Sequence, residues 1–596
     1  MTVFAAPIAD MHFAATHLAG FSEIAALPGG EDLSEELLLS ILEEGGKFAA
    51  GVLAPLNQIG DRQGSRLENG IVRTPDGWSD AYHAFVEGGW NAVPFSAEFG
   101  GQGLPWLVAT ALQEMWHASS MAYALCPMLT QAVVEALSHH ASAEIKARFL
   151  PRLVAGEWTG TMNLTEPQAG SDLAAIRTRA VREGNHYRIT GQKIFITYGD
   201  HEMTDNIVHL VLARLPDAPP GVKGISLFVV PKFLVSEDGK LAERNDLRCV
   251  SLEHKMGIHA SPTAVMSYGE NGGAYGLLVG EENKGLQYMF TTMNNARLAV
   301  GLEGVGIAER ALQKAASFAR ERVQSRDATS DDPNPVTIIH HPDIRRMLLT
   351  MRALTEASRA LAYFAAAKLD IAKRHPDPQE QMKAQAIVDL LIPVVKGWGS
   401  EVGSEAASLG VQIHGGMGYI EETGAAQFMR DAKIAEIYEG TNGIQANDLI
   451  GRKLTRDGGE TARSFIAHMR SLDGALAKSE ADLASLRTSL MAGLKSLEQA
   501  TDWILSRTVD NRRDAASGAM NYLRLWGTVI GGWLMARAAL AAEVDLQSRQ
   551  GNPNFLQRKI ITARFYGEHI LPRATSLQAA TTAGAATLMA MDSEAF

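Results

Sequence analysis

The stretch HYRITGQKIFIT, His186–Thr197, decides the fold, because it is a β-type pattern within a sequence that is otherwise helical in character. β-branched and aromatic residues recur in it, and similar short runs follow in NIVHLVLARL, Asn206–Leu215, and GISLFVVP, Gly224–Pro231. Runs of this composition, separated by Gly, Pro, Asn and Asp, are typical of strands. We therefore predict a middle β domain over residues 160–283.

Helical patterns lie on both sides of this predicted β domain. Apolar residues recur at helical spacing in ELLLSILEEGGKFAAGVLAPL, Glu36–Leu56, and again in the long Ala/Leu/Arg-rich run Met293–Gln324. We predict an N-terminal extension over residues 1–33, a helical domain over 34–159, a helical bundle over 284–455 and a further helical domain over 460–596. The fold class is thus α+β and multidomain.

The composition excludes several classes of protein. Of 596 residues, 46% are hydrophobic and 20% are charged, which are values of a folded globular chain. The 55 Lys and Arg residues and the 67 Asp and Glu residues give a net charge of −12. This charge argues against non-specific electrostatic binding of nucleic acid or of an anionic membrane by the whole protein surface. Only Cys126 and Cys249 are present, so neither a disulfide framework nor a metal site is indicated.

The termini and apolar segments predict a cytoplasmic protein. The N-terminal stretch MTVFAAPIADMHFAATHLAG has no basic leader region and does not read as a signal peptide. The segment Leu525–Ala536 is strongly apolar but is shorter than the ~20 residues that a membrane span needs. We therefore expect no membrane span.

Two turn-like motifs are candidate ligand sites. LTEPQAGSD, Leu164–Asp172, is dense in small and hydroxyl residues, whose backbone N–H groups can hold a pyrophosphate. The same residues are also what an ordinary interdomain turn prefers. HGGMGY, His414–Tyr419, has a similar ambiguity, because glycines admit a ligand close to the backbone but also end helices.

A third motif places a carboxylate at a helix end. AKIAEIYEGTNGIQ, Ala432–Gln445, runs a helical pattern into Glu439, Gly440 and Thr441. If Glu439 faces an apolar pocket, desolvation raises its pKa and makes it a usable general base. A solvated surface role is the alternative, and Glu436 fits that role better because Lys433 lies three residues before it.

Taken together, four stretches carry a family resemblance. LTEPQAGSD, GQKIFIT, QIHGGMGY and IYEGTNGIQ occur in the order and context found in the acyl-CoA dehydrogenase flavoproteins, and the resemblance runs from about Ser34 to Lys453. GDRQGSRLENG, KMGIHASPTA, HHPDIRRMLL and the tail after Gly458 resemble the large-subunit branch. That branch includes 3-methylmercaptopropionyl-CoA dehydrogenases and bacterial fatty acyl-CoA dehydrogenases.

The resemblance implies a fold and an activity. The implied fold is an N-terminal helical domain, a middle β-barrel or sandwich, a four-helix bundle and an additional C-terminal helical domain. The implied activity, part of fatty acid β-oxidation, is FAD-dependent oxidation of an acyl-CoA to the trans-2-enoyl-CoA. A carboxylate takes the α-proton while the β-hydrogen leaves as hydride to flavin N5. Implied partners are the acyl-CoA, an electron-transfer flavoprotein and a second copy of the chain, as a homodimer rather than a tetramer.

By this resemblance Glu439 corresponds to the base. Some relatives carry the base before an Arg on an earlier helix, but that position is Ala296 here, before Arg297, and alanine accepts no proton. The implied cofactor contacts are Leu164, Thr165, Gly170, Ser171, Phe195, Ile196, Thr197, Arg322, Gln324, Gln412, Gly415, Gly416 and Thr441. The implied substrate contacts are Ser171, Arg297, Tyr438 and Gly440.

Two departures from the family pattern concern the cofactor contacts. Phe195 stands where many relatives have Trp, which keeps a flat aromatic surface. Asn442 and Gly443 stand where Ser and Gln are commoner, which leaves side-chain contacts to FAD open at that point.

The substrate and two other functions also stay open. SSMAYALCPML, Ser119–Leu129, matches the helix at the blind end of the acyl pocket and would accept an aliphatic chain or a thioether, although core packing explains the same residues. The substrate is therefore 3-methylthiopropanoyl-CoA or a short-, medium- or long-chain acyl-CoA. An acyl-CoA oxidase is one alternative. A DNA-binding flavoprotein of the same fold is the other, weakly supported by 15 basic and 12 acidic residues after residue 460.

Overall fold

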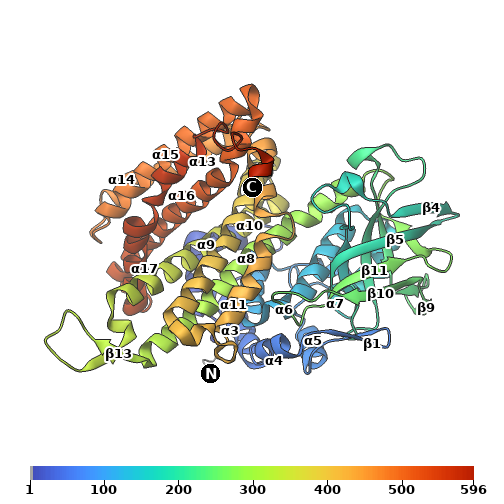
Figure 1. Ribbon diagram of the computed structural model, residues 1–596, viewed down its shortest axis with the longest axis horizontal. Coiled ribbons are helices and arrows are strands. Elements are labelled where there is room, and N and C mark those ends of the chain that lie inside the picture. Colours follow the sequence, from blue (N-terminus) through green and yellow to red (C-terminus); the bar gives the residue numbers. More distant parts are fainter. Residues whose placement is uncertain (1–3) are drawn as a thin grey trace. The chain divides into compact units, whose positions relative to one another are not determined.

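The computed structural model describes residues 4–596, apart from the side chains of residues 291–294. The chain divides into two compact units. One contains residues 47–109 and 115–299, and the other contains the chain up to residue 46 together with 110–114 and 300–596. The first unit holds the large sheet, and the second holds the long helices coloured yellow to red in Figure 1.

The large sheet has eight strands: β3 (Thr159–Asn163), β4 (Arg179–Glu183), β5 (His186–Thr197), β6 (Ile207–Ala213), β7 (Ser226–Pro231), β10 (Leu247–Leu252), β11 (Thr263–Tyr268) and β12 (Ala274–Leu278). Their order is β10-β11-β5-β12-β7-β6-β3, with β4 added on β5. All pairs are antiparallel except β3 with β6. The long strand β5 pairs with β11 at its C-terminal end and with β4 and β12 at its N-terminal end, so it joins the two halves of the sheet.

Four helices belong to the same unit as this sheet: α4 (Leu56–Gln63), α5 (Trp78–Glu87), most of α6 (Trp106–His140) and α7 (Ala143–Ala155). A short hairpin, β1 (Arg66–Glu68) with β2 (Ile71–Arg73), lies between α4 and α5. Helix α6 is buried along its apolar length and breaks helical geometry at Ser120. The expected sequence of a helical region followed by a β region is confirmed.

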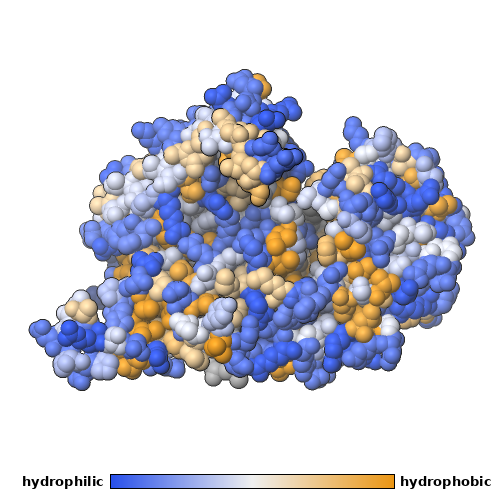
Figure 2. Space-filling view, in the orientation of Figure 1, coloured by the Kyte–Doolittle hydropathy of each residue, from blue (hydrophilic) through white to orange (hydrophobic). Residues whose placement is uncertain are grey.

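The second unit is built on three long helices, α8 (Gly285–Glu321) from residue 300 onward, α9 (Pro342–Arg374) and α10 (Pro378–His414). Helices α8 and α10 approach very closely at Gly304. A Cβ on this residue would lie 2.0 Å from the carbonyl oxygen of Gly399. A hairpin, β13 (Val323–Arg326) with β14 (Pro335–Thr337), projects between α8 and α9 and is largely hydrophilic. Figure 2 shows this hairpin at the lower left.

The C-terminal segment adds five helices of eight or more residues to that bundle: α13 (Glu460–Arg470), α15 (Ala484–Asp510), α16 (Arg512–Gln547), α17 (Pro553–Phe565) and α18 (Arg573–Thr581). Helix α16 is their core, and its Gly527 faces Trp398 of α10 so closely that a Cβ would lie 2.2 Å from the ring. Arg524 pairs with Glu401 of α10 at 2.8 Å. The additional helical region expected from the sequence is confirmed, and it packs on the bundle.

Two described helices, α6 and α16, are long and apolar enough to cross a membrane. Their most apolar windows are 100% and 83% buried inside the structure, which is the behaviour of core helices.

A buried charge cluster ties the N-terminal extension to the bundle and the C-terminal helices. Asp10, in α1 (Ile8–Phe13), accepts from Lys559 Nζ at 2.6 Å and from Arg359 at 2.5 Å. Lys559 also binds Glu356 at 2.7 Å, and Arg359 binds Glu114 at 2.6 Å. Burial alone would raise the pKa of Asp10, but Lys559 and Arg359 hold it well below its usual range.

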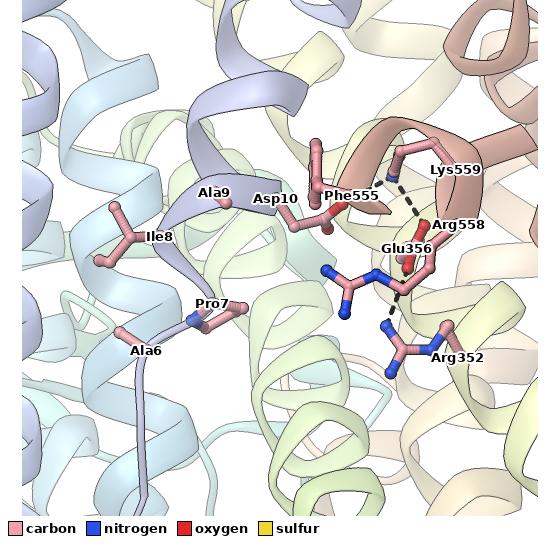
Figure 3. A pocket seen from close by; sticks show the side chains of 10 residues that line it. All are labelled: Ala6, Pro7, Ile8, Ala9, Asp10, Arg352, Glu356, Phe555, Arg558 and Lys559. Atoms are coloured by element: carbon pink, nitrogen blue, oxygen red, sulfur yellow. Dashed lines mark hydrogen bonds and ion pairs between the residues drawn. The ribbon is translucent and has the colours of Figure 1, made fainter. Parts of the chain in front are cut away.

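A cavity of about 360 Å³ opens beside this cluster (Figure 3). Asp10, Glu356 and Lys559 line it together with Arg352 and Arg558, and dashed lines in Figure 3 join the paired groups. Its carboxylates are neutralised by the cations already in contact with them, and it shares no lining residue with the Glu439 motif. We therefore regard it as part of the structural charge cluster.

Candidate active site

Glu439 lies on a turn with unusual backbone geometry. The turn follows the 3-10 segment η9 (Lys433–Glu436) and precedes α12 (Asn442–Asp448). Glu439 has φ 55° and Gly440 has φ 85°, so two consecutive residues are left-handed. A left-handed non-glycine residue costs roughly 1–3 kcal/mol and persists only where its surroundings hold it. The half-buried Glu439 side chain is thus presented by a strained, fixed turn.

Side chains of the following helix hold this turn in place. Gln445 donates from Nε2 to the carbonyl oxygens of Glu439 and Gly440, both at 3.2 Å. Thr441 caps α12 by accepting from the N–H of Ile444 at 3.2 Å. Because both carbonyls of the left-handed pair are bonded, the backbone conformation of the turn is fixed, and with it the direction of the Glu439 Cα–Cβ bond.

Asn442 anchors the same turn to α10. It is buried, accepts from Lys396 Nζ at 2.9 Å, and donates to the carbonyl oxygen of Gly397 at 3.1 Å. Ser400 bonds the same amide group. The residue that departs from the family pattern therefore points into the bundle as a structural anchor.

The alternative carboxylate, Glu436, and the alternative helix position, Ala296, lie in surroundings that differ from those of Glu439. Glu436 pairs with Lys433 at 2.7 Å on the partly exposed side of η9. Ala296 is 1% exposed on α8, and Arg297 beside it is 3% exposed. Of these positions, only Glu439 combines a carboxylate with a fixed, left-handed turn.

The structure also reveals an acid that the sequence analysis missed. Glu303, on α8, is 0% exposed, and both its carboxyl oxygens lack a hydrogen-bond partner among the described residues. The hydroxyl of Tyr438, next to Glu439, faces it and is likewise buried and unpartnered in the described part of the chain. Burial raises the pKa of Glu303 well above its ordinary value. Tyr438 and Lys396 lower this pKa, and the charge of Glu439 raises it further. In the sequence Glu303 looks like any polar position of an amphipathic helix.

In the sheet unit, the LTEPQAGSD turn is anchored through Glu166. This buried carboxylate accepts from Lys193 Nζ at 2.8 Å and from Thr178 Oγ1 at 2.6 Å. Burial would raise its pKa, but Lys193 and the hydrogen bonds lower it to about 2. Lys193 also donates to the carbonyl oxygen of Leu164 at 2.9 Å, so strand β5 holds the turn directly.

The predicted cofactor residues of this unit are brought together by that anchor. The N–H of Ile194 bonds the carbonyl of Thr165 at 2.9 Å, which places the turn beside the strand that carries Phe195. Gly170 and Ser171 are exposed at the tip, and a Cβ on Gly170 would meet nothing within 4 Å. The sequence analysis missed Glu166 and Lys193, although both lie within the quoted motifs.

Phe195 is the strongest sign of a binding surface in the sheet. It has φ 59° at an irregularity in the pairing of β5 with β11, and its side chain is 57% exposed. Bulges of this kind re-aim a side chain at functional sites. Ile196 next to it points into the core, and Thr197 is half-buried, with its carbonyl accepting from Thr161 at 2.7 Å. A flat aromatic ring is therefore held outward on a rigid strand.

The remaining predicted cofactor residues lie at one end of the bundle. Phe318 of α8 stacks on His414 of α10 with ring centroids 4.5 Å apart, so the C-terminal ends of the two helices meet. The exposed residues that follow or surround this contact are Arg322, Gln324, Gln412, Gly415 and Gly416, and Arg322 bonds Gln324 at 3.1 Å. Met417, Tyr419 and Ile420 beside them are exposed as well.

The predicted wall of the acyl pocket is buried in α6. Met121, Tyr123, Cys126 and Met128 are each at most 5% exposed, and Tyr123 bonds the carbonyl of Ala81 at 3.3 Å. These contacts agree with core packing and with a pocket wall alike. The kink at Ser120 lies within the same segment.

Comparison with known proteins decides the family. Residues 41–157, 161–269 and 283–454 match the N-terminal, middle and C-terminal domains described for acyl-CoA dehydrogenases. Residues 461–592 match a further domain described as acetyl-CoA dehydrogenase C-terminal like. The chain belongs to the acyl-CoA dehydrogenase family. It is accordingly an oxidoreductase that acts on a CH–CH group of an acyl-CoA.

Individual relatives cover nearly the whole chain. The 3-methylmercaptopropionyl-CoA dehydrogenase of Ruegeria pomeroyi is 49% identical over 95% of this chain and 96% of the relative. A butyryl-CoA dehydrogenase of Syntrophomonas wolfei is 35% identical over 92% of each chain. An acyl-CoA dehydrogenase from Bacillus anthracis, solved in complex with FAD, shares the fold with a TM-score of 0.74 over 94% of this chain and 90% of that chain, at 21% identity.

The residues of this dehydrogenase fit a flavin. In the sheet unit, the exposed ring of Phe195 offers a flat surface, and the open backbone at Gly170 leaves room for a ligand close to the main chain. In the bundle unit, the backbone at Gly415 and Gly416 is open in the same way. FAD is the cofactor that the family uses, and these features suit its flat ring system and its pyrophosphate.

Proposed function

We propose that this dehydrogenase uses bound FAD and Glu439 to convert an acyl-CoA thioester to the trans-2-enoyl-CoA. The observation that carries the proposal is the Glu439 turn. Glu439 and Gly440 are both left-handed, and Gln445 donates hydrogen bonds to the carbonyl oxygens of both residues. Such strain is typical of catalytic positions. FAD, when bound, supplies the acceptor for the β-hydrogen, which leaves as hydride.

Glu439 takes the α-proton in this proposal. The α C–H bond breaks, its electron pair forms the new α,β double bond, and the proton ends on the Glu439 carboxylate. A carboxylate in water is far too weak a base for this step, so the site must hold it close and exclude water. The fixed turn contributes to the first requirement, since it sets the point and the direction from which the Glu439 side chain leaves the backbone.

The other predicted residues bind and orient. Leu164, Thr165, Gly170 and Ser171 hold the polar part of the cofactor, while Phe195 and Thr197 pack against its ring system. The predicted contact of Ile196 is corrected, because its side chain is 2% exposed and packs in the core behind Phe195. Thr441, Arg322, Gln324, Gln412, Gly415 and Gly416 complete the cofactor contacts, the last five on a second copy of the chain in a homodimer. Arg297, Tyr438 and Gly440, with Ser171, contact the acyl-CoA.

We propose 3-methylthiopropanoyl-CoA as the substrate, with an electron-transfer flavoprotein as electron acceptor. The support is the 49% identity to the 3-methylmercaptopropionyl-CoA dehydrogenase over almost the full length of both chains. Polarisable Met121, Met128 and Cys126 in α6 suit a thioether. The butyryl-CoA dehydrogenase relative makes a short straight chain the competing substrate.

Anaerobic bleaching of the visible flavin band tests both parts. The purified protein, with its FAD content measured, is mixed with 3-methylthiopropanoyl-CoA, butyryl-CoA and longer straight-chain acyl-CoAs. Fast bleaching by the thioether substrate, at least about tenfold faster than by butyryl-CoA, supports the substrate assignment. Equal or faster bleaching by butyryl-CoA overturns the substrate, and no bleaching by any acyl-CoA overturns the reaction.

A second measurement separates the electron acceptor. After bleaching, reoxidation is followed with an electron-transfer flavoprotein and separately with dioxygen. Transfer to the flavoprotein with little hydrogen peroxide supports a dehydrogenase. Rapid peroxide formation would mean an acyl-CoA oxidase.

A further inference from the structure

Glu303 is a carboxylic acid buried in the bundle without a partner. Its side chain is 0% exposed, and neither Oε1 nor Oε2 is hydrogen-bonded to any residue that the structure describes. An ionised carboxylate in such a place is strongly unfavourable unless it is paired. A protein that keeps a glutamate there must therefore hold it neutral or use it.

The groups that face Glu303 come from two other segments. Tyr438 and Glu439 approach from the base turn, and Lys396 approaches from α10. The Lys396 ammonium donates to Asn442 Oδ1 at 2.9 Å, which ties it to the anchor of the same turn. The Tyr438 hydroxyl is buried and interacts with the Glu303 carboxyl, which lowers the pKa of Glu303 and raises that of Tyr438. The two groups do not meet the full distance and angle of a hydrogen bond.

Helix packing keeps Glu303 in this position. Gly301 and Gly304 flank it on α8, and each meets the backbone of α10 so closely that a Cβ would lie within 2.7 Å of a carbonyl oxygen there. Helix α8 therefore cannot rotate to bring the carboxyl to solvent without a clash. These contacts fix α8 against α10, the helix to which Asn442 anchors the Glu439 turn.

We propose that Glu303 is a neutral carboxylic acid that positions Tyr438 and, through it, the turn that carries Glu439. The inference rests on the proposed role of Glu439 as the base. The Glu303 O–H donates to the Tyr438 oxygen in the loaded site, where catalytic hydrogen bonds tighten relative to the free protein. Because the charge of Glu439 raises the pKa of Glu303, a neutral Glu303 leaves Glu439 as the charged member of the two.

Infrared difference spectroscopy tests the neutral state without any turnover. The flavin-loaded wild type is compared with Glu303→Gln at about pH 8, where only a strongly shifted glutamic acid keeps its proton. We expect a protonated-carboxyl carbonyl band in the wild type that the variant lacks. A difference spectrum with carboxylate bands alone overturns the proposal.

The same spectra test positioning. The vibrations of Tyr438, identified with Tyr438→Phe, should shift in Glu303→Met, which removes the donor, and stay in place in Glu303→Gln, which keeps a neutral one. Unchanged Tyr438 vibrations in the methionine variant overturn the positioning role. Neither spectrum needs an acyl-CoA, so a failure of the proposed reaction is distinguishable from a failure of this inference.

Kinetics complete the test. Glu303→Gln should bleach the flavin within about threefold of wild type, and Glu303→Met about tenfold more slowly, the loss of one useful hydrogen bond. The acid limb of the rate profile should keep its midpoint in Glu303→Gln. Equal rates in the two variants, or an acid limb moved down by about one pH unit in Glu303→Gln, overturn the proposal, because the latter means that Glu303 carried a charge beside Glu439.

Discussion

A cluster of buried acids and a single buried acid in the same unit have opposite surroundings. Asp10, Glu114 and Glu356 are each bonded to Arg359 or Lys559 at 2.5–2.7 Å. Glu303 is equally buried but has no hydrogen-bond partner in the described part of the chain, and it lies against the Glu439 turn. Paired acids hold segments together, whereas an unpaired acid costs stability and is kept for chemistry.

The two groups also differ in what they connect. The paired cluster joins the N-terminal extension to α9 and α17, and the hydrogen bond between Asp10 and Lys559 spans 549 positions of the sequence. The unpaired acid Glu303 is on α8 and faces Tyr438 and Glu439 in the turn before α12. The first connects distant segments of the chain, and the second lies beside the proposed base Glu439.

The largest effect on flavin bleaching is expected from a substitution of Glu439, the proposed base. Glu439→Gln keeps the size and the left-handed turn but removes the base, so flavin bleaching should slow by about a thousandfold. FAD content and thermal stability should stay near wild type. A flavin-loaded variant with more than about a tenth of wild-type bleaching would contradict the role of Glu439.

Breaking the paired cluster should cost stability rather than chemistry. Arg359→Met leaves Glu114, Asp10 and Glu309 without the guanidinium that they share at 2.5–2.8 Å, and the free energy of unfolding should fall by about 3–5 kcal/mol. Denaturant unfolding measures the loss. Exposed Arg513→Met is the matched control and should change stability by less than about 0.5 kcal/mol.

The Arg359 outcome has a kinetic counterpart. The folded fraction of the Arg359 variant should bleach its flavin at the wild-type rate, because the cluster shares no residue with the base turn. A rate loss per folded, flavin-loaded molecule would mean that the two regions are coupled, and the distinction between them would fail.

The fold and the Glu439 turn could be predicted from the sequence, whereas the buried charge clusters could not. Strand β5 and Glu439 are visible in local patterns, since alternation and a Glu-Gly at a helix end are short-range signals. Neither the left-handed Phe195 nor the partners of Asp10 could be predicted, because a bulge depends on the pairing strand and the cluster on residues hundreds of positions apart. The burial of Glu303 depends on Gly301 and Gly304 of α8, which let the backbone of α10 approach.

A smaller effect should come from replacing the unpaired acid by its amide. Because the folded-state pKa of Glu303 is raised, its stability contribution is complete below the unfolded pKa near 4.5 and is lost as the pH rises above it. The free energy of unfolding of the wild type should therefore fall relative to Glu303→Gln with increasing pH. The slope is at most about 1.4 kcal/mol per pH unit, the limit for one proton. Parallel curves for the two proteins would show that Glu303 is not desolvated.

The smallest effect is expected at the carboxylate nearest in sequence to the base. Glu436 pairs with Lys433 at 2.7 Å, and because the Lys433 side chain is 51% exposed, solvent screens the pair. Such pairs contribute about 0–1 kcal/mol, so Glu436→Gln should leave bleaching within about twofold and the free energy of unfolding within about 0.5 kcal/mol of wild type. This variant lies three residues from Glu439 and loses the same charge, so it separates the specific loss of the base from a general loss of negative charge near the site. A tenfold drop in bleaching in Glu436→Gln would mean that charge in this segment, rather than the direction fixed by the left-handed turn, is what the chemistry needs.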